Sequence, residues 1–378
     1  MKSVLFLMRY PLIDAYNLKQ KFDGQIQAAV NLGYNVYFIA YDRENVYLVN
    51  KNKDAKQKIC RTRFGAFPKY RSTFGFFDLF KAFSKAQKNI HFDLVYMRSK
   101  IMLPTAISAL KKHKKSGGKL MVEIPSYNSK EQELSRFRSC VQGVASIWKK
   151  KLPQLVDLYT LIGATDVKEY NGRPALCISN GVCVENFPAH THKAGEEVRI
   201  LALASMRNWQ GYDRLIKGLS EYDGKTPVYI EMIGDDGDGS LILWRDLAKE
   251  KGVESHVNFR GALYDSQLTN AVNRCDIGAA TLGLHRKSKG VGSVLKVREY
   301  MARGIPFIYS YDDSLLDGKE PFALKITGDD SAVSIAQVVD WVETLRMNKN
   351  ITEEMRTFAK EKMSWDAQLK NAFDKVLG

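Results

Sequence analysis

Short apolar runs of strand length alternate along the chain with longer segments in which apolar residues recur every three or four positions. This alternation predicts βαβ units, in which parallel strands form a sheet and helices cover both of its faces. In the first half the predicted strands are Val4–Met8, Val36–Ala40, Asp93–Met97, Leu120–Ile124, Leu158–Ile162 and Ala175–Ile178. The predicted helices there are Lys19–Leu32, Phe76–Lys88 and Ile101–Lys112.

The second half repeats this order of strand and helix. Its predicted strands are Ile200–Ala204, Val228–Ile233, Val257–Phe259, Ile277–Ala280 and Phe307–Tyr309. Its predicted helices are Tyr212–Tyr222, Ser240–Lys251, Ser266–Arg274, Val294–Ala302 and Thr352–Leu377. The polar segment 186–197 lacks an apolar period and is predicted to be a linker. The fold class is therefore α/β, with two Rossmann-like domains that we expect to face each other across a cleft.

Length and composition agree with two globular domains. The chain has 378 residues, of which 45% are hydrophobic, and a domain usually takes roughly 100–200 residues. The apolar run Val4–Met8 is typical of a strand and is too short to cross a bilayer. The five cysteines are scattered and never spaced as C-x-x-C, which disfavours structural zinc and a disulfide framework. We therefore expect a protein of a reducing, cytoplasmic compartment.

The positive charge of the chain is unevenly distributed. The formal net charge is +15, from 57 Lys+Arg and 42 Asp+Glu. Residues 1–190 contain 31 basic and 14 acidic residues, whereas the rest contains 26 and 28, so the halves carry +17 and −2. This asymmetry indicates an anionic partner of the first half: a nucleic acid, an anionic membrane surface or a phosphorylated substrate.

Two stretches concentrate this charge, residues 51–71 and residues 74–88. At helical spacing the second stretch places phenylalanines on one face and lysines on another, which is typical of a basic amphipathic helix in a lipid interface. These residues are Phe76, Phe80 and Phe83 on one face, and Lys81, Lys85 and Lys88 on the other. In the alternative interpretation the phenylalanines belong to the core and the lysines form a solvated face.

Candidate chemistry lies in loops that follow strands of the second half, because ligands of open parallel sheets bind beyond the carboxyl ends of the strands. The segment 205–214 connects a strand to a helix and contains Arg207. Free backbone N–H groups at such a turn, together with a guanidinium group, favour a phosphate. We expect the site in the cleft between the two domains.

A second loop, residues 284–306, offers a stronger pattern. Gly290 and Gly292 allow the backbone to approach a ligand closely, and Ser293 is predicted to cap the following helix. Lys296 lies in the first helical turn, where a cation is unfavourable unless an anion binds beside it. Glu299 lies one turn further and suits the hydroxyl groups of a ribose.

Several segments of the chain occur in a familiar order and spacing. They are ISNGV at 178–182, ASMRNWQGYDRLI at 204–216, IGD at 233–235, VNFRG at 257–261 and LKVREYMARGIP at 295–306. Through them the chain resembles the family 4 glycosyltransferases of GT-B fold, in the branch of bacterial capsule, exopolysaccharide and O-antigen assembly. The first half matches more loosely, through DLVYMR at 93–98 and VEIPSY at 122–127.

The resemblance implies a retaining glycosyltransferase that uses a nucleotide-sugar as substrate, with UDP-sugar as the favoured donor and with no cofactor or metal. It implies an acceptor domain over residues 1–187, a donor domain over 188–360, and a C-terminal helix, 361–378, that returns to the first domain. The expected acceptor is a lipid-diphosphate-linked saccharide at the inner face of the cell membrane, where the protein would be peripheral.

The resemblance also assigns site residues. The implied catalytic residues are Glu299, Arg207, Lys296 and Glu123. The implied donor-binding residues are Asn208, Gln210, Gly261, Ala262, Leu263, Arg286, Gly292, Ser293, Val294 and Leu295. Arg98 joins the phenylalanines and lysines of residues 76–88 as an expected contact of the acceptor or the membrane.

Three positions depart from the family pattern. Val291 stands where the first of two paired glutamates is usual, so Ser293 or a backbone group is expected to recognise the donor sugar. Gln210 replaces a common lysine, which leaves Arg207 and Lys296 to carry more of the diphosphate charge, with Arg286 as a further contributor. The segment 123–126 lacks a usual histidine, and Glu123 or Ser126 would take an acceptor-side role.

Other functions fit the sequence less well. Asp236 and Asp238 resemble a D-x-D metal site or a calcium loop, but the segment fits a surface turn. A dehydrogenase would show G-x-G-x-x-G after the first strand, which is absent. A lone histidine, His285, is more typical of a structural or phosphate contact than of an acid or base. Nucleic-acid binding would explain the basic first half, but it would not explain the loops of the second half that favour a phosphate. A glycosyltransferase that acts on a protein or another soluble acceptor is a further alternative.

Overall fold

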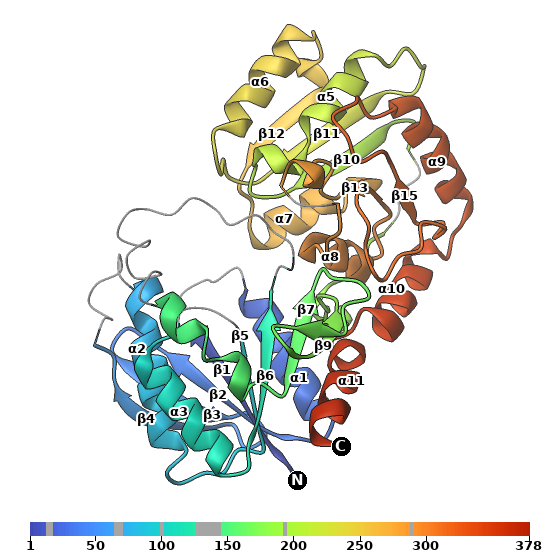
Figure 1. Cartoon of the computed structure of the whole chain (residues 1–378). Coiled ribbons are helices and arrows are strands. Elements are labelled where there is room, and N and C mark those ends of the chain that lie inside the picture. Colours follow the sequence, from blue (N-terminus) through green and yellow to red (C-terminus); the bar gives the residue numbers. More distant parts are fainter. Residues whose placement is uncertain are drawn as a thin grey trace. The chain divides into compact units, whose positions relative to one another are not determined.

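The computed structural model describes residues 1–12, 18–63, 71–98, 102–125, 127, 145–191, 195–287 and 290–378. The chain forms two compact units (Figure 1). The first contains the described residues up to Gly181 together with Trp365–Gly378, and the second contains Val182–Ser364. Each unit is an α/β domain built on its own sheet.

The sheet of the first unit has the strand order β4-β3-β2-β1-β5-β6-β7-β9-β8. Its strands are β1 (Ser3–Pro11), β2 (Asn35–Tyr41), β3 (Asn45–Asn50), β4 (Ala55–Arg61), β5 (Leu94–Arg98), β6 (Lys119–Ile124), β7 (Leu158–Ile162), β8 (Glu169–Tyr170) and β9 (Arg173–Ile178). The central strands are parallel, with Val4 of β1 level with Val36 of β2 and with Leu94 of β5. The antiparallel β3 and β4 extend one edge, and β8 extends the other.

Helices cover both faces of this sheet, because successive residues of a strand point to opposite faces. Leu5 and Leu7 of β1 pack in the core beneath α2 (Arg71–Ala86) and α3 (Pro104–Lys115). Phe6 of β1 packs in a second core beneath α1 (Lys19–Asn31) and α11 (Trp365–Leu377).

The second unit is a fully parallel sheet with the order β12-β11-β10-β13-β14-β15. Its strands are β10 (Val198–Leu203), β11 (Val228–Ile233), β12 (Val257–Gly261), β13 (Ile277–Ala279), β14 (Phe307–Tyr309) and β15 (Ala323–Lys325). Its helices are α5 (Asp213–Ser220), α6 (Ser240–Glu250), α7 (Asp265–Val272), α8 (Leu295–Arg303), α9 (Ile335–Met347) and α10 (Ile351–Lys362). Arg214, which is fully buried in α5, donates to the carbonyl groups of Leu282, Thr327 and Ser331 and so ties two loops to this helix, the one after β13 and the one after β15.

Each strand predicted from the sequence is present, with boundaries that shift by a few residues, and the α/β fold class is confirmed. The single helix predicted over Thr352–Leu377 is wrong, because the chain forms α10 and then α11. At the break, the N–H of Val182 donates to the carbonyl of Met363, and α11 then joins the first unit. There Trp365 lies against Gly24 of α1, so the predicted return of the C-terminal helix to the first domain is confirmed.

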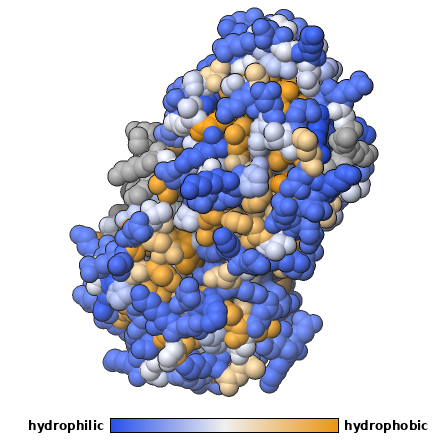
Figure 2. Space-filling view, turned by 90° about the vertical axis from the view of Figure 1, so that its right-hand side faces the viewer, coloured by the Kyte–Doolittle hydropathy of each residue, from blue (hydrophilic) through white to orange (hydrophobic). Residues whose placement is uncertain are grey.

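The surface is largely hydrophilic on the face drawn in Figure 2, where smaller hydrophobic areas interrupt the polar residues. In the described part of the chain, no helix has both the length and the apolar character that a bilayer-spanning segment requires.

Candidate functional site

The loops chosen from the sequence meet at one place in the second unit. The strands β10, β11 and β12 follow one another toward one edge of the sheet, whereas β13, β14 and β15 follow one another toward the other edge. The strand order therefore reverses between the neighbours β10 and β13. In open parallel sheets, ligands bind in the crevice beyond the carboxyl ends of the strands at such a switch point. The loops that leave β10 and β13 there are 204–212 and 280–294.

Glycines hold these two loops in contact. Gly211 adopts a left-handed backbone with φ of 72°, and a Cβ atom on it would lie 2.4 Å from the backbone nitrogen of Gly283. The N–H of Leu282 donates to the carbonyl of Gln210 at 2.8 Å. The close approach requires glycine at position 211, because any side chain there would displace the opposite backbone.

Lys296, in the first turn of α8, points into the loop that follows β10. Its Nζ donates to Gln210 Oε1 at 2.8 Å and to the hydroxyl of Tyr212 at 2.6 Å. Thr281 Oγ1 donates to the same Gln210 oxygen, so both loops contribute to this cluster. Burial lowers the pKa of Lys296 to about 7, although the Glu299 carboxylate opposes the shift. Half of the molecules would thus lack this charge near neutral pH in the empty site.

Arg207 lies in the same loop and packs across Gly237, which belongs to the loop after β11. Within the described residues its guanidinium group makes no hydrogen bond and no ion pair, so its donors remain available to a ligand. It thus offers a fixed positive charge beside the carboxyl end of β10.

Arg286 has the opposite character, because its donors are already used. It forms a two-pronged ion pair with Asp213 at 2.8 and 2.9 Å, pairs with Asp330 at 2.6 Å, and donates to the backbone and side chain of Asn208. His285 also contacts Asp330, at 3.1 Å. Arg286, in the loop after β13, is thus bonded to Asn208, in the loop after β10, and holds the two loops together.

The glycine loop before α8 is held by the strand edge beside it. The N–H of Gly292 donates to the carbonyl of Asp312 at 2.9 Å, and Val291 forms a bridge with Asp312. The prediction that Ser293 caps α8 is wrong, because the N-cap is Val294 and makes no side-chain capping bond. Ser293 Oγ instead accepts from Arg298 at 3.2 Å, which satisfies part of a buried guanidinium group.

Glu299 lies one turn beyond Lys296 and is paired on its own helix. Its Oε1 accepts from Arg303 Nε at 3.0 Å and forms a 2.9 Å ion pair with Arg303 Nη2. Leu295, at the helix start, is exposed. The first turn of α8 leaves backbone N–H groups without partners inside the helix, which adds positive potential at this end.

The segment predicted to frame a base follows β12. Gly261 closes this strand with φ of 69°, and its carbonyl accepts from the N–H of Gly234 at the end of β11. Ala262 is half-buried, and Leu263 packs against the core of the unit.

The acidic turn after β11 uses its carboxylates within the loop. Asp236 Oδ1 accepts from the N–H of Gly239 at 2.8 Å, and Asp238 Oδ1 accepts from the hydroxyl of Ser240. Asp238 Oδ2 accepts from the N–H of Asn208, which connects this turn to the loop after β10. These contacts fit the surface turn expected from the sequence.

In the first unit, Glu123 at the end of β6 is enclosed by donors. Its Oε1 faces Lys21 Nζ at 2.9 Å and Arg98 Nε at 3.0 Å, and its Oε2 accepts from Gln25 and Tyr96, each at 2.7 Å. Burial raises the pKa of Glu123, but the charges of Lys21 and Arg98 outweigh this and lower it to about 2.

The catalytic role expected for Glu123 therefore does not fit. The side chain is fully buried, and a carboxylate of so low a pKa is a poor base at neutral pH. Its function in the structure is to hold Lys21 and Arg98, and Ser126 lies outside the described residues. The outer Nη groups of Arg98 have no hydrogen-bond partner in the described part of the chain.

The three phenylalanines of α2 belong to the core, as the alternative interpretation holds. Phe76, Phe80 and Phe83 are 8%, 1% and 0% exposed and pack beneath the sheet. The prediction that these phenylalanines contact lipid is therefore wrong. The lysines remain toward solvent. Lys81 in α2 is half-buried, Lys85 near the end of α2 is exposed, and Lys88, two residues beyond this helix, is also exposed. Lys85 also donates to the carbonyl of Ile59, which brings α2 next to the lysine-rich β4.

Several residues of the two clusters were missed in the sequence. Tyr212 and Thr281 bind the Lys296–Gln210 pair, and Lys21 and Gln25 bind Glu123. The sequence did contain a sign of the roles of Lys21 and Gln25. They are four residues apart, on the face of α1 that also buries Phe22 and Ile26. Long polar side chains on a buried helical face usually have specific partners.

Comparison with known proteins finds similarity in structure alone. No protein-family model matches the chain, and no curated protein matches it in sequence. A glycosyltransferase from Rickettsia africae superimposes with a TM-score of 0.63 at 15% identity, covering 99% of this chain and 97% of that one. The sucrose-phosphate synthase of Thermosynechococcus elongatus gives 0.64 at 13% identity, covering 99% and 98%. Anabaena HepE in complex with UDP gives 0.58 at 14% identity and covers both chains fully.

These matches show the fold. Both sheets and the returning C-terminal helix correspond to the GT-B fold of glycosyltransferases, and the similarity extends over the whole chain.

Proposed function

We propose that the protein is a nucleotide-sugar-dependent glycosyltransferase whose donor site is the crevice at the β10/β13 switch point. The observation that carries this proposal is a group of three cationic elements beside the switch point. They are Arg207, whose guanidinium group makes no hydrogen bond or ion pair with any described residue, Lys296 at the start of α8, and the N-terminal N–H groups of that helix. A diphosphate would supply the negative charge that this group lacks. The same fold binds UDP in the Anabaena protein, which supports a uridine nucleotide.

In the proposed reaction, the bond between C1 of the donor sugar and the β-phosphate oxygen breaks, and its electron pair leaves with the nucleoside diphosphate. A hydroxyl oxygen of the acceptor forms the new bond to C1 and releases its proton. Negative charge on the leaving diphosphate increases in the transition state, where Arg207, Lys296 and the start of α8 stabilise it. We infer retention at C1 from the family resemblance. We assign Glu299 to the ribose through its Oε2, which makes no hydrogen bond or ion pair with the residues that the structure describes.

Other donor contacts are assigned by their positions. Gln210 fixes the Lys296 ammonium group, and backbone groups at Gly261, Ala262 and Leu263 would frame the base. Since Val291 is held at Asp312, sugar recognition would come from Ser293 or from backbone groups of Gly292, Val294 and Leu295. Asn208 and Arg286 would act by keeping the two loops together.

For the acceptor, we propose a lipid-diphosphate-linked saccharide. In the first unit the strand order reverses between β1 and β5, and Arg98 lies at the carboxyl end of β5. Two cations, Lys21 and Arg98, face the single carboxylate of Glu123, and the Nη groups of Arg98 make no hydrogen bond among the described residues. This local excess of positive charge favours a phosphate of the acceptor. The exposed lysines of α2 and β4 would contribute attraction to an anionic membrane.

The experiment that tests the donor assignment is replacement of Glu299. Donor hydrolysis is first screened across uridine- and guanosine-diphosphate sugars to find a substrate. Glu299→Gln should then lower turnover by about 10²-fold or more, because it removes a contact to the ribose. We expect its free energy of unfolding to fall by no more than about 1–2 kcal/mol. Within the described residues the variant loses only the i,i+4 ion pair with the largely buried Arg303, from which glutamine can still accept a hydrogen bond.

The matched control is Glu343→Gln, which removes a similar ion pair, with Arg346 of α9. Unchanged turnover in the Glu299→Gln variant would contradict the donor assignment, whereas the control should keep full activity.

A further inference from the structure

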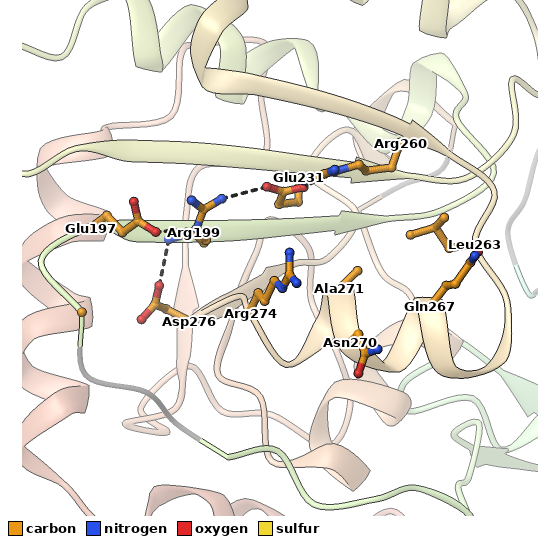
Figure 3. Close-up of a pocket in the computed structure, with 11 residues that line it drawn as sticks. Glu197, Arg199, Glu231, Arg260, Leu263, Gln267, Asn270, Ala271, Arg274 and Asp276 are labelled. Carbon is orange, nitrogen blue, oxygen red and sulfur yellow. Dashed lines mark hydrogen bonds and ion pairs between the residues drawn. The ribbon is translucent and has the colours of Figure 1, made fainter.

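A pocket lies in the second unit between its sheet and α7, and its volume is about 700 Å³ (Figure 3). Strands β10, β11 and β12 form one wall, and α7 with Arg274 just after it forms the other. Of the 11 lining residues, only Leu263 belongs to the segments assigned to the donor. The pocket is therefore a feature separate from the cationic group at the switch point.

The wall formed by the strands is a fixed network of ion pairs. Glu231, which is 5% exposed, faces Arg199 Nη1 and Arg260 Nε, each at 2.9 Å, and also accepts from Asn258. Asp276 accepts from the backbone of Arg199 and from Arg346. The carboxylates of this wall are thus already occupied, which leaves little negative charge available to a ligand.

The groups that remain available are mostly donors. Gln267 and Asn270 are three residues apart and so share one side of α7, and Arg274 follows just after the end of this helix. Their side chains make no hydrogen bond or ion pair within the described residues, and neither do the Nη groups of Arg260. Figure 3 shows Arg274 extending from the end of α7 toward the strands.

The chemistry of these groups indicates the ligand. A guanidinium edge binds phosphate or carboxylate through two parallel hydrogen bonds. Side-chain amides both donate and accept, which suits hydroxyl groups. Leu263 and Ala271 add small apolar surfaces, and the volume lies within the usual range of small-molecule sites.

We propose that this pocket binds a small anionic carbohydrate, with its phosphate or carboxylate between Arg260 and Arg274 and its hydroxyl groups on Gln267 and Asn270. The site is independent of the proposed transfer reaction, because its cations and amides come from α7 and β12 and not from the loops at the switch point.

Ligand-detected NMR titrations of the full chain test the proposal with glucose 6-phosphate, glucuronate, glucose and inorganic phosphate. We expect one or both anionic sugars to bind at least about tenfold more tightly than glucose and than inorganic phosphate. The first two probes distinguish a phosphate from a carboxylate. Binding of neither would overturn the proposal.

Variants locate the site. Arg274→Gln and Arg260→Gln should each weaken binding about tenfold or more, and Asn270→Trp should block it by filling the space without removing an ion pair. Arg61→Gln, an exposed arginine of β4, is the matched control and should bind as the parent protein does. Unchanged affinity in Arg274→Gln and Asn270→Trp would overturn the assignment. Loss of sugar binding in Lys296→Met would overturn it as well, because Lys296 belongs to the switch point and does not line the pocket.

Discussion

The pKa of Lys296 leads to a quantitative prediction about donor binding. Burial lowers this pKa to about 7 in the empty site, against about 10.4 for a free lysine. At pH 8, one unit above this value, about one molecule in ten is protonated at Lys296. A bound diphosphate favours the charged form and raises the pKa again. Each binding event at pH 8 should therefore take up about 0.9 proton.

The sign of the pH dependence follows from this linkage. Affinity for UDP should change little between about pH 6 and pH 7, where most Lys296 side chains are already charged before UDP binds and the terminal phosphate of UDP is still largely ionised. Above pH 7 the dissociation constant should rise about tenfold per pH unit, because a proton must be bound together with the ligand. The terminal phosphate of UDP is ionised at pH 8, since the second pKa of such phosphates lies at about 6.

Isothermal titration calorimetry of UDP in HEPES and in Tris at pH 8 measures this uptake, because the two buffers release protons with different enthalpies. The Lys296→Met variant should bind UDP more weakly and without proton uptake. The Lys296→Arg variant should bind UDP without proton uptake, because arginine keeps its charge at every pH of the assay. Lys225→Gln, at an exposed lysine, should behave as the parent protein does. A proton uptake below about 0.3 in the parent protein would refute the reasoning. A Lys296→Met variant that takes up as many protons as the parent protein would refute it too.

Three further outcomes are expected. Glu123→Gln should lower the free energy of unfolding by about 3–5 kcal/mol in urea denaturation at pH 7, because the buried Lys21 and the half-buried Arg98 lose their carboxylate partner. Glu44→Gln, at an exposed site, should change it little. A loss below about 1 kcal/mol would contradict the paired cluster. Gly211→Ala should lower the free energy of unfolding by about 3 kcal/mol or more and should abolish UDP binding. Gly239→Ala should lower it by only about 1 kcal/mol, because Gly239 has the same positive φ but a Cβ atom there would have no neighbour within 4 Å. Equal losses in both would show that the loop contact is unimportant. The protein should sediment with anionic vesicles at low salt and dissociate from them as salt increases. Replacement of Lys81, Lys85 and Lys88 by glutamine should abolish this sedimentation. Equal binding to neutral vesicles would argue against the membrane role.

Much of the fold was predictable because parallel strands buried on both faces appear in a sequence as continuous apolar runs. The predicted limits of Leu158–Ile162, Val228–Ile233 and Phe307–Tyr309 agree with the structure for this reason. The edge strand β4 was missed because its side chains are mostly exposed lysines and polar residues, which give no apolar signal. Lysines on an edge strand also prevent pairing with other chains, so part of the basic stretch has this structural function.

The site was predictable only at the level of its loops. The pattern of glycines and cations selected Arg207 and Lys296, and both lie at the switch point. Their partners were not predictable, because the contact of Lys296 with Tyr212 joins residues 84 positions apart and depends on the order of strands in the sheet. The amphipathic pattern of α2 could not show which side its phenylalanines face, since a core and a bilayer select the same apolar stripe.

The return of α11 to the first unit has a consequence for biosynthesis. The core beneath α1 includes Trp365, Leu369 and Phe373, which are the last part of that core to be synthesised. The whole of Val182–Ser364 is made before them, a delay on the order of ten seconds or more at roughly 5–20 residues per second. The second unit can therefore complete its core while the first still exposes the groove that α11 will fill. A chaperone that recognises apolar grooves would find its substrate in this nascent N-terminal unit.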